Sequence, residues 1–330
     1  MIEAKKKTMI EDKNYSLLKQ LIEKQMETFE LKELIGYGSE SHVYKSIIKK
    51  INKPVTMKII YNKKKQNKNL KEIEIANKLR NKNVINFFGL KNLKSENCDV
   101  DCIIMEYSKF GNLRQFQRNF IKSYYMSEST LCYFSYLILK GLKYCHMSKI
   151  AHLDIKPQNI IIDDTLNLKI IDFSISIDYR NINRTIKLPY CGTQNYMAPE
   201  IINSEVIDVN DLEKVDLFSL GVMLYNFAFC SYPYDSNEET NDEQKPQIEE
   251  KMNNIMEENK LQYSKYFVNF LKKLLEQDIK KRINIRQAME DYWINGAKIL
   301  LEEKEKLNNA NIFLSYLMFD YFHSFNQYIL

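Results

Sequence analysis

Two stretches in the first quarter of the chain carry residues that could grip phosphate groups. Residues 35–43 (IGYGSESHV) form a glycine-rich turn, where two glycines let backbone N–H groups approach an anion closely. Lys58 ends an expected buried strand, where an unpaired charge is costly, and Glu72 is the candidate partner. A plain hairpin turn and ordinary surface charges remain the simpler interpretations of these features. A dinucleotide-binding fold is disfavoured because a strand, not a helix, follows the glycines.

The hydrophobic pattern indicates which elements would position these residues. From 29 to 61, short apolar runs alternate with turn residues, which is typical of a three-stranded antiparallel meander. An amphipathic helix is expected at 69–80, and further strands at 84–90 and 101–106. Later residues are mostly helical, and 212–230 is apolar nearly all round and should be buried. Helices are also expected at 264–276 and 285–294. A sheet followed by helices predicts an α+β fold with two lobes.

Both ends of the chain carry apolar side chains that need cover. A helix is expected at 12–28, with Leu17, Leu18, Leu21, Ile22 and Met26 at helical spacing. The tail 311–330 is rich in aromatic residues and too apolar to stay solvated. For both segments two interpretations stay open: packing on the rest of the chain, or docking a partner.

Composition and charge exclude several classes of protein. Of 330 residues, 45% are hydrophobic and 28% charged, as in ordinary globular proteins. The net charge of +5 is too even a balance to indicate nucleic-acid binding, and only seven of the 48 basic residues are Arg. The six cysteines form no C-x-x-C pair, which disfavours a zinc site. Neither a secretory signal nor a membrane anchor is recognisable, so we expect a cytoplasmic or nuclear protein.

A series of motifs resembles the eukaryotic protein kinases of the serine/threonine type. Residues 152–159 (HLDIKPQN) are similar to the catalytic loop of that family, 172–174 (DFS) to its DFG motif and 197–200 (MAPE) to its APE motif. Residues 216–221 (DLFSLG) resemble its buried anchor helix, and 278–282 (DIKKR) resemble a late arginine motif. The motifs follow the family's order over about 29–295.

The resemblance implies the two-lobed protein kinase fold. A small antiparallel β-sheet lobe with one key helix would occupy about 29–106, and a larger, mainly α-helical lobe about 109–295. Residues 1–28 would be an N-terminal helical extension, and 296–330 an aromatic-rich helical C-terminal tail that packs on the large lobe or docks a partner.

The resemblance also implies ATP as the phosphate donor, with Mg²⁺ or Mn²⁺. Lys58 would hold the α- and β-phosphates, and Glu72 would hold Lys58. Asn159 and Asp172 would coordinate the metal ion, which prefers hard oxygen ligands.

Two residues of the catalytic-loop motif would act on the transferred group. Asp154 would accept the proton of the attacking hydroxyl. Lys156 would touch the γ-phosphate and is the residue typical of serine/threonine kinases. Protein substrates with Ser/Thr acceptors are therefore expected.

The remaining nucleotide contacts follow from the same resemblance. Met105 would be the gatekeeper beside a hinge at 104–108, where backbone groups of Glu106 and Ser108 would bond the adenine edge. The glycine-rich turn and the apolar walls would supply Ile35, Gly36, Tyr37, Gly38, Ser39, Glu40, Ser41, His42, Val43, Thr56 and Ile161.

Leu153 departs from the family pattern, which usually has an Arg before the catalytic Asp to receive an activation-loop phosphate. This non-RD pattern predicts that Asp154 is aligned without loop phosphorylation. Thr185 and Tyr190 are the expected phosphosites, and Arg180 or Arg184 would be the phosphate-binding residue if loop phosphorylation proved necessary.

Two structural contacts are expected around the segment that ends in MAPE. Thr193 should bond Lys156 and Asp154. Glu200 should pair with Arg282 beneath the segment, because a planar guanidinium binds a carboxylate through two hydrogen bonds.

Only two positions of the sequence bear on which substrate residues the chain prefers. Members that select substrate arginines usually carry Glu where this chain has Asn112 and Asn226. Coulomb attraction for a basic substrate is therefore expected to be weak.

Two other functions are weighed against protein phosphorylation. A pseudokinase scaffold would usually lack one of the four charged or amide residues that the chemistry needs, and this chain has Lys58, Asp154, Asn159 and Asp172. A phosphotransferase for small molecules would rarely combine MAPE with the late arginine.

Overall fold

The computed structural model describes residues 16, 18–37, 41–61, 72–75, 77–95, 98–120, 125–234 and 248–307. The chain divides into two compact units. Unit 1 contains residues up to Asn77 together with Ile85–Ser108, and unit 2 contains Lys78–Val84 and the chain from Lys109 onward. The two units are described separately below.

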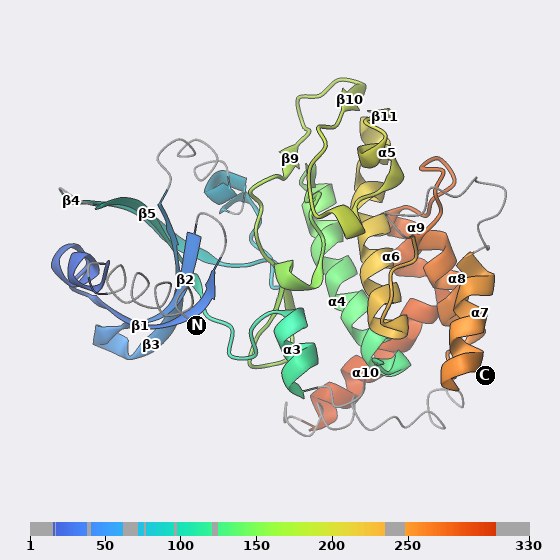
Figure 1. The fold of residues 1–330 in the computed structure, drawn as a ribbon, viewed down its shortest axis with the longest axis horizontal. Coiled ribbons are helices and arrows are strands. Elements are labelled where there is room, and N and C mark those ends of the chain that lie inside the picture. Colours follow the sequence, from blue (N-terminus) through green and yellow to red (C-terminus); the bar gives the residue numbers. More distant parts are fainter. Residues whose placement is uncertain are drawn as a thin grey trace, which may run out of the picture. The chain divides into compact units, whose positions relative to one another are not determined.

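Unit 1 is built on a five-stranded antiparallel sheet with strand order β1-β2-β3-β5-β4 (Figure 1). Its strands are β1 (Phe29–Tyr37), β2 (Ser41–Ile48), β3 (Lys53–Ile60), β4 (Phe87–Ser95) and β5 (Cys98–Glu106). The predicted meander over 29–61 is confirmed. The strand expected at 84–90 begins only at Phe87, because the residues before it form a turn and an isolated bridge from Val84 to Ile170. The helix expected at 69–80 is helical at 72–75 and 77–78.

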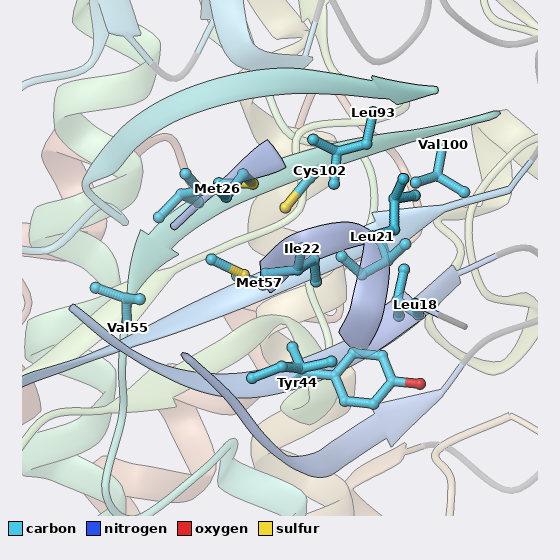
Figure 2. Packing of buried hydrophobic residues seen from close by; sticks show 13 residues of the cluster. Leu18, Leu21, Ile22, Met26, Tyr44, Val55, Met57, Leu93, Val100 and Cys102 are labelled. Atoms are coloured by element: carbon cyan, nitrogen blue, oxygen red, sulfur yellow. The ribbon is translucent and has the colours of Figure 1, made fainter. Parts of the chain in front are cut away.

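A helix near the N-terminus, helical at 16 and 18–25, covers one face of this sheet. Figure 2 shows Leu18, Leu21, Ile22 and Met26 packed among side chains from the strands. Ile22 is fully buried, and so are Val55, Met57, Ile59 and Cys102 of the same cluster. Of the two interpretations left open for this segment, packing on the chain is therefore the one observed.

Successive side chains of β3 point to opposite faces of the sheet. Val55, Met57 and Ile59 belong to the cluster beneath the N-terminal helix. Thr56 and Lys58 alternate with them and so face the opposite side. The helix thus stabilises the strand that carries Lys58 without lying on the face to which that lysine points.

Unit 2 is mainly helical, with short strand pairs around its loops (Figure 1). Its α-helices are α3 (Leu113–Phe120), α4 (Glu128–Met147), α5 (Pro199–Ile202), α6 (Glu213–Phe229), α7 (Ile248–Asn259), α8 (Lys265–Leu274), α9 (Ile285–Glu290) and α10 (Tyr292–Leu307). Its strands are β6 (Ile150–Ala151), β7 (Ile160–Ile162), β8 (Leu168–Ile170), β9 (Ile177–Asp178), β10 (Thr185–Lys187) and β11 (Val206–Asp208).

Helix α6 is the centre of unit 2, as its apolar sequence predicted. Every side chain from Val215 to Phe229 is buried. A Cβ on Gly221 would lie 2.8 Å from the Cβ of Leu274, so glycine permits the close approach of α8. Helix α6 also packs against α4, and Asp216 is its one buried carboxylate.

The C-terminal helices differ from the prediction at one point. The helix expected at 285–294 is interrupted at Asp291, which is extended (φ −61°, ψ 141°) and whose Oδ1 accepts from the Trp293 N–H at 3.0 Å. Helix α10 then runs to Leu307, past the expected domain boundary at 295, and packs on α4. The tail 311–330 and the acidic stretch 235–247 lie outside the described residues. Within the described ranges, every helix is too short or too polar to cross a membrane.

Candidate active site

The loop between β6 and β7 is fixed by the buried carboxylate of α6. Asp216 accepts from the backbone N–H groups of His152 at 2.9 Å and Leu153 at 2.7 Å, and lies 2.8 Å from His146 Nε2. Burial raises the pKa of Asp216, but the hydrogen bond with His146 and the charges and amides around it outweigh burial and bring the pKa below its ordinary value. A charged Asp216 therefore anchors the loop, whose Leu153 takes a left-handed φ of 68°.

Asp154 is the centre of a hydrogen-bond cluster in this loop. Its Oδ1 accepts from Thr193 Oγ1 at 2.7 Å, and its Oδ2 accepts from Asn159 Nδ2 at 2.9 Å. Lys156 Nζ lies 2.6 Å from Asp154 Oδ2 and donates to Thr193 Oγ1, also at 2.6 Å. The contacts predicted for Thr193 are present. Because both carboxylate oxygens are held, the side chain of Asp154 has a fixed direction.

Asn159 and Asp172 offer oxygen ligands suited to a hard cation. Ile171 N–H donates to the Asn159 carbonyl at 2.9 Å, so Asp172 follows directly on a residue bonded to Asn159. Asn159 Nδ2 donates to the carbonyl and to Oδ2 of Asp154, which turns the amide oxygen Oδ1 away from that residue. An amide oxygen and a carboxylate are ligands that Mg²⁺ accepts, so the donor chemistry fits the metal that the resemblance implies.

The backbone conformation at Asp172 is unusual. Its φ of 66° lies in the left-handed region, which costs energy for a residue other than glycine.

Groups of three or more His, Cys, Asp or Glu side chains that could hold a metal are not found in the part of the chain described.

His152 ties the catalytic loop to the segment around Asp172. Its Nδ1 accepts from the Asp154 N–H at 3.2 Å, so Nε2 carries the proton that it donates to the Ile171 carbonyl at 2.9 Å. Its ring meets the buried ring of Phe173 edge-on, with centroids 5.0 Å apart. The histidine thereby links the backbone on both sides of the site.

In unit 1, Lys58 and Glu72 form the ion pair that the sequence suggested. Lys58 Nζ lies 3.1 Å and 3.2 Å from the two carboxylate oxygens of Glu72. The Glu72 side chain is only 2% exposed, whereas that of Lys58 is 18% exposed. The lysine therefore has a fixed position and still presents part of its surface to solvent.

The other expected nucleotide residues of unit 1 lie on its strands. Ile35, Gly36 and Tyr37 end β1, Ser41, His42 and Val43 begin β2, and Gly36 pairs with Val43. Gly38, Ser39 and Glu40 lie outside the described residues. Thr56 pairs with Met105 across β3 and β5, and both side chains are buried. Ser108 follows β5.

Glu106, at the end of β5, is held by Asn86. The Asn86 N–H and Nδ2 donate to its two carboxylate oxygens at 3.1 Å and 3.0 Å, and the Glu106 N–H donates to the Asn86 carbonyl at 3.1 Å. The side chain is therefore engaged within unit 1. In unit 2, Ile161 lies on β7 and is 8% exposed.

The segment from Asp172 to Glu200 is held by backbone pairing at two places. Strand β9 pairs with β6, and β10 pairs with β11, where Thr185 lies opposite Asp208. The Val209 N–H also donates to the Arg184 carbonyl at 3.0 Å. Thr185 is exposed, as is Tyr190 at 58%. The ordered segment thus leaves both expected phosphosites open to solvent.

Arg180 is already engaged by a neighbouring carboxylate. Its Nε donates to Asp178 Oδ1 at 2.9 Å, and its Nη2 pairs with Oδ2. The hydrogen bond from Arg180 is the main reason why the pKa of Asp178 is lowered to about 2. Binding a phosphate on Arg180 would therefore compete with this pair.

The predicted pair of Glu200 and Arg282 is present and buried. Arg282 Nη1 and Nη2 donate to the two Glu200 oxygens at 2.7 Å and 3.0 Å. The side chains are 0% and 2% exposed for Arg282 and Glu200. The guanidinium also donates to three backbone carbonyls, those of Lys214, Glu276 and Gln277. All five of its N–H donors are thereby satisfied.

Arg114 is a residue near this site that the sequence did not single out. Its Nη2 lies 3.4 Å from Tyr196 Oη and 3.2 Å from Asn226 Oδ1. These partners are 82 and 112 residues away in the chain, so no local pattern reveals the contact. Asn226, one of the two positions expected to bear on substrate preference, accepts a hydrogen bond from this cation.

Comparison with known proteins agrees with this geometry. A family model described as protein kinase domain matches residues 29–294. The chain is 29% identical to an Aurora kinase of Dictyostelium discoideum, over 82% of this chain and 66% of that protein. It is 30% identical to serine/threonine-protein kinase Aurora-1 of Arabidopsis thaliana, over 64% of this chain and 68% of that protein.

A third relative matches this chain over only half of its own length. Serine/threonine-protein kinase pakH of Dictyostelium discoideum is 31% identical over 82% of this chain but only 50% of its own length. The chain thus spans between half and about two thirds of the length of these relatives.

Proposed function

The chain belongs to the protein kinase family, and on that premise we propose that it transfers the γ-phosphoryl group of ATP, with Mg²⁺, to Ser/Thr hydroxyls of protein substrates. The observation that carries this proposal is the cluster around Asp154. Its carboxylate is aimed by Thr193 and Asn159, and Lys156 lies against it. A fixed carboxylate beside a fixed ammonium is suited to a reaction that depends on positioning and charge stabilisation.

Asp154 is proposed to orient the acceptor and take its proton. The hydroxyl oxygen forms a bond to the γ-phosphorus while the bond to the bridging β–γ oxygen breaks, and ADP leaves. The proton of the hydroxyl passes to a carboxylate oxygen of Asp154. Thr193 and Asn159 prevent the carboxylate from turning away during the step, because each holds one of its oxygens.

Lys156 is proposed to stabilise the γ-phosphoryl group. Its ammonium is 21% exposed and is held by Asp154 and Thr193. A cation so placed offsets the negative charge that spreads over the phosphoryl oxygens in the transition state.

Asn159 and Asp172 are proposed to hold Mg²⁺, and the fit rests on the free direction of the Asn159 amide oxygen. When bound, the ion neutralises phosphate charge. The chain's own contribution is to keep these two ligands at fixed backbone positions through Ile171 and His152.

Lys58 is proposed to bind the α- and β-phosphates of ATP. Glu72 fixes its direction without removing it from solvent. The backbone of Glu106 and Ser108 is proposed to bond the adenine edge, with Met105 and Thr56 against the ring. Ile35, Val43 and Ile161 would supply apolar contacts, as nucleotide pockets usually require.

A test on three acceptors separates the proposal from its alternatives. Purified chain with labelled ATP and Mg²⁺ is offered Ser/Thr peptides, a tyrosine peptide and choline, and the products are identified by mass spectrometry. Phosphoserine or phosphothreonine alone supports the proposal. Nucleotide binding without transfer to any acceptor would establish a pseudokinase, and phosphocholine would establish a small-molecule phosphotransferase.

A further inference from the structure

Among the described residues, the side-chain partners of Arg114, in the first turn of α3, are all neutral. Its guanidinium donates to Gln117 Oε1 at 3.0 Å, to Asn226 Oδ1 at 3.2 Å and to Tyr196 Oη at 3.4 Å. Asn226 is 7% exposed, so one of the acceptors that hold the guanidinium is buried. No carboxylate among the described residues pairs with this cation.

Each of the other arginines in the described part of the chain either pairs with a carboxylate or is exposed to solvent. Arg180, Arg282 and Arg286 each pair with a carboxylate. The remaining three are exposed, and water can solvate their charge: Arg80, Arg118 and Arg184. Arg114 is the half-buried arginine of the described residues whose charge is met by neither a carboxylate nor full solvation.

Stability of the helix does not explain a cation at this position. Arg114 is the second residue of α3 (Leu113–Phe120), where the unpaired N–H groups make the helix end positive. A positive side chain there is unfavourable by the sign of the helix dipole. The residue fits better as the binding partner of an external anion.

Hydrogen bonds connect Arg114 to the catalytic carboxylate within unit 2. Tyr196, which accepts from Arg114, donates its backbone N–H to the Thr193 carbonyl at 2.8 Å. Thr193 Oγ1 in turn donates to Asp154 Oδ1 at 2.7 Å. The guanidinium therefore lies beside the segment that aligns Asp154.

Two tyrosine rings lie next to the guanidinium. The ring of Tyr232 stands edge-on to that of Tyr196, with centroids 5.7 Å apart. A guanidinium held by these three acceptors keeps N–H donors on Nε and Nη1 for an external carboxylate, and little side-chain entropy is lost on binding.

We propose that Arg114 determines substrate specificity by binding an Asp or Glu side chain close to the Ser/Thr acceptor. This inference rests on the proposed function. It predicts a preference for acidic protein substrates, which is a stronger statement than the absence of attraction for basic ones.

The test compares peptides that differ in one residue. A neutral serine peptide is varied by placing Glu, Ala or Arg at each of the four positions on either side of the acceptor. For the wild-type chain, Glu at one of these positions should raise kcat/KM about threefold to tenfold over Ala at the same position, and added salt should reduce the difference.

Two variants address the cation, and one serves as control. Arg114→Gln should bring the Glu-to-Ala ratio to about one. Asn226→Asp should do the same with the arginine still present, because it places an internal carboxylate where Asn226 Oδ1 now lies 3.2 Å from Nη2. Arg118→Gln, on the same helix but exposed, should leave the ratio as in wild type.

The outcomes separate this inference from the proposed function. Wild-type activity on the neutral peptide supports phosphotransfer whatever the preference. A wild-type ratio of one at every position, or a ratio that survives both Arg114→Gln and Asn226→Asp, would overturn the role of Arg114. Because Asn226→Asp keeps the side-chain shape, it gives an answer even if Arg114→Gln folds poorly.

Discussion

Removal of the Arg282 side chain should weaken the structure far more than removal of an exposed arginine on a neighbouring helix. Arg282→Ala leaves the Glu200 carboxylate at 2% exposure without its two N–H donors. Breaking a buried pair in this way typically costs about 3–5 kcal/mol. That is a large part of a domain stability of roughly 5–15 kcal/mol.

The expected effect on stability is measured by thermal and urea unfolding. A loss of about 3–5 kcal/mol should lower Tm by about 5–10 °C for a unit of this size. The matched control is Arg286→Ala, because Arg286 pairs with Glu290 at side-chain exposures of 83% and 65%. An exposed pair contributes less than about 1 kcal/mol, so the control should melt close to wild type.

A double variant shows whether the stranded charge causes the loss. Glu200→Gln combined with Arg282→Ala removes the carboxylate as well as its partner. The double variant should therefore be more stable than Arg282→Ala alone, because a neutral amide is less costly to bury than a charge.

Loss of the Glu200–Arg282 pair should also lower activity, because Glu200 lies close in sequence to Thr193 and Tyr196. Glu200 is in α5, which follows the segment that contains those two residues. In Arg282→Ala, peptide phosphorylation should therefore fall more than ATP affinity. Equal Tm for Arg282→Ala and Arg286→Ala, with unchanged peptide kinetics, would refute the structural role of the pair.

The remaining predictions concern three other features. Thr193→Val should reduce turnover about tenfold to a hundredfold, with Thr193→Ser largely restoring it, because the hydroxyl bridges the catalytic pair; equal rates for both variants would contradict this role. Ile22→Ala should cost about 2–4 kcal/mol in urea unfolding, and the exposed Glu23→Ala almost nothing; equal stability of the two would show that the N-terminal helix is not held on the sheet. Phosphatase-treated chain, and Thr185→Ala with Tyr190→Phe, should keep most of the initial rate, whereas a loss of about a hundredfold would show that a loop phosphate is needed.

The contacts that could be predicted from the sequence are those fixed by motifs. Lys58 with Glu72, Thr193 with Asp154, and Glu200 with Arg282 all join residues whose types and order already indicated a partner. The buried helix α6 was also evident, because a helix apolar on every side has no face for water.

Other features depend on tertiary contacts that leave little trace in the sequence. The amphipathic N-terminal segment showed an apolar stripe but not the surface that the stripe would cover, which is the sheet face formed by residues such as Val55 and Met57. Strands β10 and β11 have three residues each, too few to show a period of two.

Arg114 is the clearest case of a site residue hidden from sequence reasoning. In the sequence it is one of two arginines on a short helix. Its significance arises from the neutral acceptors that Tyr196 and Asn226 bring to it from distant parts of the chain.

The central claim is that Asp154 carries out proton acceptance in phosphoryl transfer from ATP. The most direct measurement compares wild type with Asp154→Asn for turnover on a Ser/Thr peptide and for ATP affinity with Mg²⁺. The variant should bind ATP as wild type does but turn over about 10²–10⁴-fold more slowly, because the amide cannot accept the proton, and chelation of Mg²⁺ should stop the wild-type reaction. Equal turnover of the two proteins, or wild-type transfer undiminished by chelation, would contradict the account.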